Sequence, residues 1–315
     1  MTVRPRRSVL YMPGSNARAL EKAAELPVDG LILDLEDAVA PEAKLQARAA
    51  VVKALQKGFG DREVLVRING LDTRWWVDDI DAAAASSRPD AVLVPKVSSP
   101  RQLQDLAARL VDTGTDPHVR VWAMMETPLA MLNVRDIAAA ALDSETRLAG
   151  FVMGTNDLAK DTRARLVPGR APMVPWLMNC LAAARAYGLD ILDGVYNDID
   201  NAAGFVEECR QARDLGFDGK TLIHPRQIEP CNQAFSPTPE EVAEAHKILA
   251  AFDLPENENK AVIQVDGRMV ERLHAEMARR TVTIADAIAK RRQQPGVDLN
   301  ANTGRFGLTL PNNSL

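Results

Sequence analysis

Short apolar segments alternate with longer amphipathic segments from about residue 8 to residue 225. The short segments are rich in β-branched and aliphatic residues, as buried strands usually are. Eight strands are predicted, at residues 8–12, 30–35, 63–68, 91–96, 119–126, 147–154, 191–196 and 219–223. In the longer segments apolar residues recur every three or four positions, which predicts helices. These include residues 16–26, 42–55, 99–111, 175–188 and 202–216.

Strands that alternate with helices indicate an α/β fold, and eight of them favour a closed TIM (β/α)8 barrel over an open, doubly wound sheet. An open sheet that binds a nucleotide would carry GxGxxG after its first strand, where this chain has YMPGSNAR. We therefore expect a barrel catalytic domain over residues 1–235.

A second region follows the expected barrel. Residues 237–252 form another amphipathic pattern, and residues 261–291 come after the polar stretch PENENK. We expect residues 236–292 to form a C-terminal helical lid extension. Residues 293–315 are rich in Gly, Pro and Asn and lack periodicity, which predicts a flexible tail.

Composition narrows the class of protein. Of 315 residues, 46% are hydrophobic and 26% charged, as in ordinary globular proteins. The formal charge of -5 and the pI of about 5.5 provide no electrostatic basis for nucleic-acid binding. The sequence has no bilayer-length apolar run and no signal peptide pattern, so we expect a cytoplasmic protein without a membrane partner. Cys180, Cys209 and Cys231 are widely separated, and we interpret them as reduced thiols.

The chemistry of such a barrel lies where its strands end. Polar or turn-forming residues occupy all these positions, at residues 13–14, 34–37, 67–70, 95–96, 126–128, 156–157, 193 and 223–225.

Glu126 and Asp157 follow consecutive expected strands, and neighbouring strands lie about 4.8 Å apart. Two converging carboxylates raise each other's pKa unless a cation lies between them. Mg²⁺ suits this pair because it commonly takes one or two protein carboxylates and fills its other positions with water and substrate oxygens. The alternative is that each acid only caps the helix that follows it.

Arg67 ends the third expected strand, where its guanidinium can bind a carboxylate through two parallel hydrogen bonds. The alternative is an ion pair with the acids of DLED. We expect one or two of Asp34, Glu36 and Asp37 to orient Arg67 or metal-bound water, although a solvated loop would also explain each acid.

Arg18 and Lys22 lie four residues apart and share one face of the first expected helix. Together they suit a phosphate group, although each alone is typical of a solvated helix surface. His224 precedes Pro225 at the last strand end, where it is a candidate for the site. The alternative is a hydrogen-bonded imidazole with a purely structural role.

Taken in order, these motifs resemble those of the HpcH/HpaI aldolase and citrate lyase β-subunit family. The resemblance covers the chain to about residue 290. The motifs that carry it are RSVLYMPG, DGLILDLEDAV, VRIN, the PK and ET that end strands four and five, GTNDL and GFDGKTLIHPRQI.

The resemblance implies homotrimers or hexamers in which the extension covers a neighbouring subunit's site. It implies that Glu126 and Asp157 bind Mg²⁺ and that Arg67 binds the carboxylate or oxo-acid part of the substrate. Contacts to coenzyme A are implied for a further set of residues, Tyr11, Arg18, Lys22, Ile223 and His224. Lysine is usual at the position of Arg18.

One motif departs from the family. A GxMxD segment of the extension carries the aspartate that acts as acid or base in a neighbouring site, and this chain has GRMVE, ending at Glu271. A glutamate keeps the carboxyl chemistry but lies one methylene farther out, which changes hydrogen-bond reach. The alternative is an exposed glutamate at a helix start.

The leading hypothesis is therefore a Mg²⁺-dependent lyase. It would cleave or form malyl-CoA, methylmalyl-CoA or citramalyl-CoA, with an acyl-CoA and a 2-oxo acid on the other side of the reaction. Arg67 and Glu271 are its predicted catalytic residues. The alternatives are a (3S)-malyl-CoA-type thioesterase, a citrate lyase β subunit in a larger complex, an aldolase of free 2-oxo acids, and a non-catalytic binding subunit.

Overall fold

The computed structural model describes residues 4–84 and 89–292. Eight parallel strands close into a barrel in sequence order, because β1 pairs with both β2 and β8. All eight predicted strands are confirmed. Their bounds are β1 (Ser8–Pro13), β2 (Gly30–Asp34), β3 (Glu63–Arg67), β4 (Ala91–Val94), β5 (Arg120–Met125), β6 (Leu148–Met153), β7 (Asp190–Asp193) and β8 (Gly219–Leu222).

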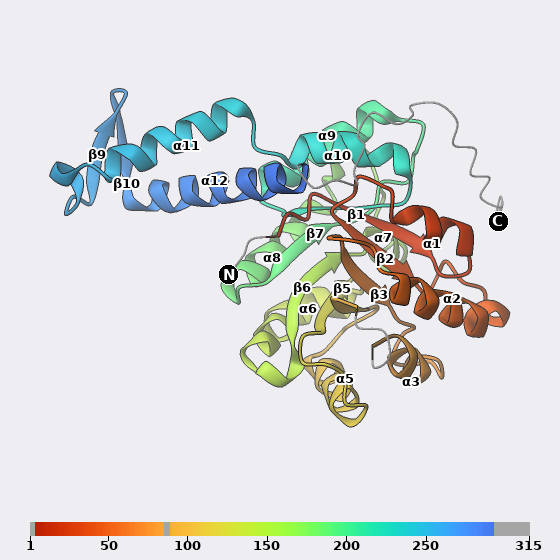
Figure 1. The fold of residues 1–315 in the computed structure, drawn as a ribbon. Helices are drawn as coiled ribbons and strands as arrows, with labels where there is room; N and C mark the ends of the chain where they lie inside the picture. The colour runs from red at the N-terminus through yellow and green to blue at the C-terminus, as the bar shows by residue number, and fades with distance from the viewer. Residues whose placement is uncertain (1–3, 85–88, 293–315) are drawn as a thin grey trace.

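Helices follow every strand and surround the barrel (Figure 1). The fold is thus the predicted TIM barrel. These helices are α1 (Ala17–Ala23), α2 (Lys44–Lys57), α3 (Trp76–Asp79), α5 (Pro100–Asp112), α6 (Pro128–Ala139), α7 (Thr155–Thr162), α8 (Val174–Ala186), α9 (Ala202–Leu215) and α10 (Ile228–Phe235). The capping boxes and prolines at several helix starts explain where these helices begin; α5, for example, follows Ser99 and has Pro100 in its first turn.

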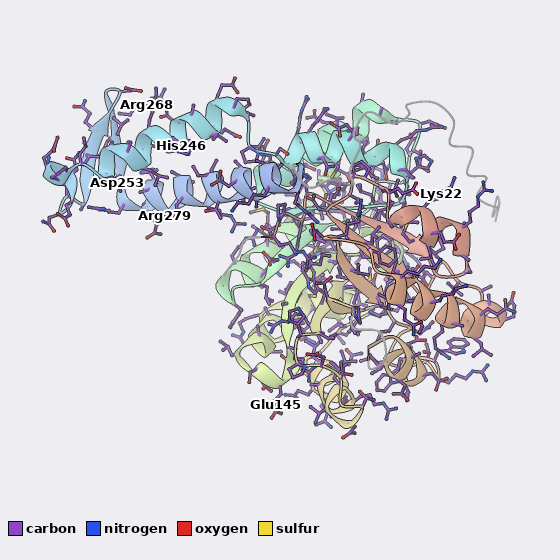
Figure 2. The ribbon with its side chains drawn as sticks, in the orientation of Figure 1. Lys22, Glu145, His246, Asp253, Arg268 and Arg279 are labelled. Atoms are coloured by element: carbon purple, nitrogen blue, oxygen red, sulfur yellow. The ribbon has the colours of Figure 1, made fainter. Side chains whose placement is uncertain are left out.

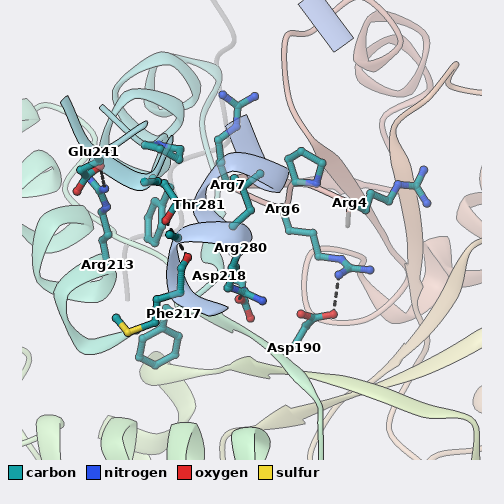
Figure 3. A pocket seen from close by; sticks show the side chains of 18 of the residues that line it. Arg4, Arg6, Arg7, Asp190, Arg213, Phe217, Asp218, Glu241, Arg280 and Thr281 are labelled. Carbon is teal, nitrogen blue, oxygen red and sulfur yellow. Dashed lines mark hydrogen bonds and ion pairs between the residues drawn. The ribbon is translucent and has the colours of Figure 1, made fainter. Parts of the chain in front are cut away.

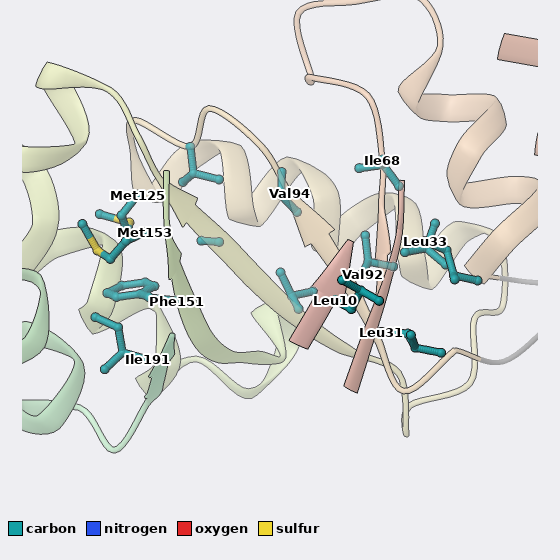
Figure 4. Packing of buried hydrophobic residues seen from close by; sticks show 14 of the residues in the cluster. Leu10, Leu31, Leu33, Ile68, Val92, Val94, Met125, Phe151, Met153 and Ile191 are labelled. Carbon is teal, nitrogen blue, oxygen red and sulfur yellow. The ribbon is translucent and has the colours of Figure 1, made fainter. Parts of the chain in front are cut away.

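Alternation along the strands divides the apolar side chains into two layers. One set packs between the sheet and the helices, and Figure 4 shows members such as Leu33, Val92 and Phe151. The other set fills the barrel interior around Trp122. Gly150 on the adjacent strand makes room for this ring, since a Cβ there would lie 2.6 Å from it.

The C-terminal extension is an arm that projects from the barrel (Figure 1). Helices α11 (Pro239–Phe252) and α12 (Arg272–Arg292) lie side by side, and β9 (Val262–Val265) and β10 (Arg268–Glu271) form an antiparallel hairpin near the tip. The hairpin departs from the helical extension expected from the sequence. It buries Ile263 and Val270 against Phe252 and Ala275, which gives the tip its own small core.

The arm is attached to the end of the barrel at which the strands begin. Arg291 of α12 pairs with Asp29, just before β2, at 3.0 Å, and Arg280 pairs with Asp218, just before β8, at 2.8 Å. Figure 3 shows the second pair in a cavity of about 1320 Å³ between arm and barrel. The arm base therefore lies at the opposite end of the barrel from the strand ends that carry the predicted chemistry.

Within the part of the chain described, no helix is both long and apolar enough to span a bilayer. The predicted tail, residues 293–315, lies outside the described residues.

Candidate active site

Arg67 is the central cation at the barrel mouth, the end at which the strands terminate. The parallel register of β2 and β3 places it beside Asp34. Its Nε and Nη2 atoms donate to the two Asp34 oxygens at 2.7 and 2.6 Å, and its Nη1 atom lies 3.0 Å from Glu36. The guanidinium also lies 4.9 Å from the centroid of the Tyr11 ring. These contacts hold a buried arginine in one orientation.

The electrostatics of the pair follow from burial and charge. Burial alone would raise the pKa of Asp34, but the Arg67 guanidinium and two backbone N–H donors hold that pKa below its usual value. Burial would lower the pKa of Arg67, and the charge of Asp34 raises it far above the ordinary range instead. Glu36 shows the opposite balance, since burial raises its pKa despite Arg67 and Lys96. The mouth therefore has more carboxyl groups than Arg67 alone neutralises.

Glu126 directly follows β5 and is 1% exposed. One carboxylate oxygen accepts the backbone N–H of Lys96 at 2.7 Å. Gly154, which follows β6, lies so close that a Cβ there would overlap the Glu126 side chain. Burial raises the pKa of Glu126 to about 8; Arg67 opposes this rise, and the charges of Glu36 and Asp157 add to it. Among the residues that the structure describes, no cation forms an ion pair with this enclosed carboxyl group, and Arg67 acts on it only at longer range.

Asp157 lies in the first turn of α7 and is partly exposed. Its charge acts on Glu126, so the structure brings the two predicted metal ligands to one side of the mouth. The described residues contain no cluster of three or more acidic, histidine or cysteine side chains suited to a metal. Two carboxylates still suffice for Mg²⁺, which keeps several water or substrate oxygens as ligands. The raised pKa of Glu126 fits a site where a cation replaces the missing positive charge.

Lys96 is a mouth residue to which the sequence analysis assigned no role. Its backbone adopts a left-handed φ of 55°, which directs its N–H at Glu126, and its ammonium group pairs with Glu36. The same ammonium lies 3.7 Å from Asp37, whose side chain is otherwise exposed. The strand-end position of Pro95-Lys96 was a visible signal, but the left-handed conformation was not.

The residues expected to contact coenzyme A lie on elements at the same end of the barrel. Arg18 and Lys22 are exposed on α1, where Figure 2 shows Lys22 at the surface. Ile223 and His224 follow β8, and both their backbone N–H groups donate to the side chain of Gln227, at 3.0 and 3.2 Å. Burial and the charge of Arg226 lower the pKa of His224. A neutral imidazole that accepts a backbone N–H suits the structural role considered for it.

Glu271 does not join the other predicted residues in its own chain. It ends β10 near the tip of the arm, which projects away from the barrel (Figures 1 and 2). Its backbone N–H donates to the His274 ring at 2.9 Å, and its side chain is partly exposed. Helices α11 and α12 separate it from the barrel, since a 14-residue helix alone is about 21 Å long.

The chain is similar to known proteins of one family. The family model for HpcH/HpaI aldolase/citrate lyase matches residues 7–225. A (3S)-malyl-CoA thioesterase of Cereibacter sphaeroides is 49% identical over 286 residues, which cover 90% of this chain and 96% of that protein. Citrate lyase subunit beta of Escherichia coli is 34% identical over 85% of this chain and 89% of its own length.

Among solved structures, CitE of Mycobacterium tuberculosis in complex with magnesium, acetoacetate and coenzyme A superposes with a TM-score of 0.70 at 28% identity. The superposition covers 90% of this chain and all of that one. From its barrel, its mouth residues and these relatives, the chain belongs to the HpcH/HpaI aldolase/citrate lyase family.

Proposed function

We propose that the protein hydrolyses the thioester of a short β-hydroxyacyl-CoA of the (3S)-malyl-CoA type in a Mg²⁺-dependent reaction. The observation that carries the site is the buried Glu126 carboxyl group, set beside Asp157 and Arg67 at the barrel mouth. The reaction class rests on the thioesterase relative, which is 49% identical over nearly its whole length. The sequence alone favours carbon–carbon cleavage, and the similarity to this relative favours hydrolysis instead.

Arg67 binds the terminal carboxylate of the substrate in this proposal. Two of its nitrogen atoms are held by Asp34, and Nη1, which lies 3.0 Å from Glu36 and 3.8 Å from the Met124 sulfur, is the nitrogen that the substrate carboxylate would share with Glu36. Asp34 thereby fixes the direction from which the substrate carboxylate can approach. Such fixed donors cost no reorganisation when the substrate binds.

Glu126 and Asp157 would hold the metal ion, with substrate and water oxygens completing its ligands. When bound, Mg²⁺ supplies the positive charge that this carboxyl-rich mouth lacks and polarises a substrate oxygen. Lys96 keeps one Glu126 oxygen engaged through its backbone N–H, and the absence of a side chain at Gly154 leaves the space that the Glu126 side chain occupies. The chain therefore holds the Glu126 carboxylate in place before any ligand arrives.

Glu271 acts in the site of a neighbouring copy, because the arm carries it away from its own mouth. There it removes a proton from water as the water oxygen bonds to the thioester carbonyl carbon. The carbon–sulfur bond then breaks, and the coenzyme A sulfur takes up the proton. Arg18 and Lys22 on α1 bind coenzyme A phosphates, with Tyr11 and the Ile223–His224 backbone beside them. Such sharing requires more than one copy, and the family resemblance implies a homotrimer or hexamer.

Carbon–carbon cleavage is the second candidate, favoured by the 34% identity to citrate lyase subunit beta. In that reaction the substrate hydroxyl group gives its proton to water, the bond between the hydroxyl-bearing carbon and its neighbour breaks, and a 2-oxo acid and an acyl-CoA enolate remain. Glu271 then donates a proton to the enolate carbon instead of accepting one from water. The same mouth serves both reactions, so the products alone separate them.

A product-resolved screen tests the proposal. Malyl-CoA, methylmalyl-CoA, citramalyl-CoA and citryl-CoA are each incubated with the protein and Mg²⁺, and products are identified by mass spectrometry. Free coenzyme A with the intact hydroxy acid supports hydrolysis, whereas an acyl-CoA with a 2-oxo acid supports cleavage. No product from any of the four substrates would contradict both reactions.

A subunit-mixing experiment tests the role of the arm. Asp157→Asn and Glu271→Gln proteins are each expected to be nearly inactive, because one lacks the metal carboxylate and the other the proton acceptor. Unfolding and refolding them together produces mixed assemblies in which some sites receive an intact Asp157 and an intact neighbouring Glu271. Recovered activity supports a shared site, and its absence in a well-refolded mixture contradicts one.

A further inference from the structure

A charged cluster outside the barrel mouth has no part in the proposed reaction. It lies between the sheet and α9, where Lys220 of β8 and Asp193 of β7 are both fully buried. The Lys220 ammonium donates to Asp193 at 2.7 Å and to Glu208 at 2.7 Å. Arg170 donates to both Asp193 oxygens at 2.8 and 2.9 Å. Two cations and two anions balance the charge of the cluster.

Stability alone is a weak explanation for this cluster. Each buried charge loses several kcal/mol of hydration, and apolar side chains of similar volume often stabilise a protein as well or better. A hydrogen-bonded network helps to fix geometry, because few arrangements satisfy its donors. Here Arg170 Nη2 is buried without a hydrogen-bond partner, whereas the Lys220 ammonium is bonded. We therefore expect the cluster to hold a neighbouring part of the chain in place.

The third donor of the Lys220 ammonium group identifies the segment that the cluster holds. It binds the backbone oxygen of Gly194 at 2.5 Å, at the start of the β7–α9 loop, residues 194–201. Gly194 in turn packs on the first residue of α7, since a Cβ there would lie 2.7 Å from the Thr155 hydroxyl. All three donors of Lys220 are thus used, one of them on a loop at the barrel mouth.

The β7–α9 loop contacts both halves of the candidate site. On the metal side, the Asn197 amide exchanges two hydrogen bonds, at 3.1 and 2.7 Å, with that of Asn156, the residue before Asp157. On the coenzyme A side, the backbone oxygen of Tyr196 accepts from Gln227 at 2.9 Å. The side-chain oxygen of Gln227 accepts hydrogen bonds from the backbone N–H groups of Ile223 and His224.

We propose that Lys220 is a positioning residue that anchors the β7–α9 loop and so fixes Asp157 relative to the Ile223–His224 segment. The inference rests on the proposed function, because it assigns these two elements to the metal and to coenzyme A. Lys220 itself touches neither ligand. Its effect is transmitted by Gly194, and then by Asn197 on one side and Gln227 on the other.

Three variants test the proposal. Asn197→Ala cuts only the link to the metal side, and the variant is expected to fold because Asn197 is exposed. Lys220→Met removes the anchor itself. Asn179→Ala is the matched control, since that amide makes a 3.3 Å bond to Met131 on α6 and does not contact the loop. Binding of MgCl₂ and of free coenzyme A is measured by calorimetry, and turnover is measured with (3S)-malyl-CoA.

Asn197→Ala is expected to raise the Mg²⁺ dissociation constant about tenfold and to lower kcat by a similar factor, as loss of a second-layer contact to a ligand often does. Its KM and its affinity for coenzyme A should stay within about twofold of wild type, because the other link is intact. Lys220→Met should weaken the binding of both Mg²⁺ and coenzyme A, and the control Asn179→Ala should change none of these values.

A purely structural cluster would lower the unfolding temperature and leave the Mg²⁺ affinity of the folded variants unchanged. If Asn197→Ala and folded Lys220→Met bind both ligands like wild type, the positioning role is wrong while the proposed function stands. If Lys220→Met does not fold, Asn197→Ala alone decides. If wild type binds neither Mg²⁺ nor coenzyme A, both proposals fail together.

Discussion

Replacing Glu126 by Gln should stabilise the metal-free protein, and the gain should grow with pH. The unfolded glutamate loses its proton near its ordinary pKa of 4.5, whereas the native carboxyl group, with a pKa of about 8, keeps its proton to higher pH. Between these values the native state binds more protons than the unfolded state, so stability falls as pH rises. Above about pH 8 both states are ionised, and the stability lost through Glu126 no longer grows. Gln cannot ionise, and its amide oxygen can still accept the Lys96 N–H.

The magnitude follows from the difference between the two pKa values. At 1.36 kcal/mol for each tenfold change, it corresponds to at most about 5 kcal/mol, and local relaxation reduces this to about 2 to 4 kcal/mol. For a chain of 315 residues, about 2 kcal/mol raises the unfolding temperature by about 3 °C. Little gain is expected at pH 5, where most of the native and part of the unfolded carboxyl population is protonated.

Thermal unfolding followed by circular dichroism, with chelator and from pH 5 to pH 9, measures this difference. Glu276→Gln on the exposed face of α12 is the control and should match wild type at every pH. Adding Mg²⁺ at pH 8 should stabilise wild type and leave Glu126→Gln nearly unchanged, because the ion binds the ionised carboxylate. Parallel pH profiles for wild type and Glu126→Gln, or equal stabilisation of both by Mg²⁺, would refute the reasoning.

Other changes at the mouth have distinct expected results. Arg67→Lys loses the two-bond geometry with Asp34 and should lower kcat/KM about a hundredfold or more in steady-state assays, while a retained cation limits the loss of stability to about 1 to 3 kcal/mol in denaturant titrations. Gly154→Ala forces the Glu126 side chain to move and should weaken Mg²⁺ binding in calorimetry at least tenfold; an unchanged affinity would mean that Glu126 is not a ligand. Asp157→Ala should abolish turnover, and so should chelation of the metal from wild type. Full activity in either experiment would show that the reaction does not need a metal ion bound at Asp157.

Much of the fold was predictable because its signals are local. Each strand is a short apolar run bounded by polar residues, and the order of strands and helices indicated a barrel before any contact was known. The pairing of Asp34 with Arg67 also follows from topology, since both end adjacent parallel strands in register. The convergence of Glu126 and Asp157 was open to the same argument, because their strands are neighbours.

Other features depend on contacts that no local pattern reveals. The left-handed backbone of Lys96 is stabilised by two acids that are distant in sequence. Its N–H donates to Glu126, and its ammonium group pairs with Glu36. The hairpin at the arm tip is only eight strand residues long and is held by a small core that includes a helix residue, Phe252. The direction of the arm is set by ion pairs such as that between Arg291 and Asp29, 262 residues apart. These features therefore emerged only from the structure.

The most direct test of the central claim is hydrolysis of (3S)-malyl-CoA in ¹⁸O-labelled water with Mg²⁺, followed by mass spectrometry of the products. The account predicts equal amounts of free coenzyme A and malate, with one ¹⁸O atom in the malate carboxylate that came from the thioester, and no turnover after chelation. Acetyl-CoA and glyoxylate in place of malate would contradict hydrolysis and assign the site to carbon–carbon cleavage.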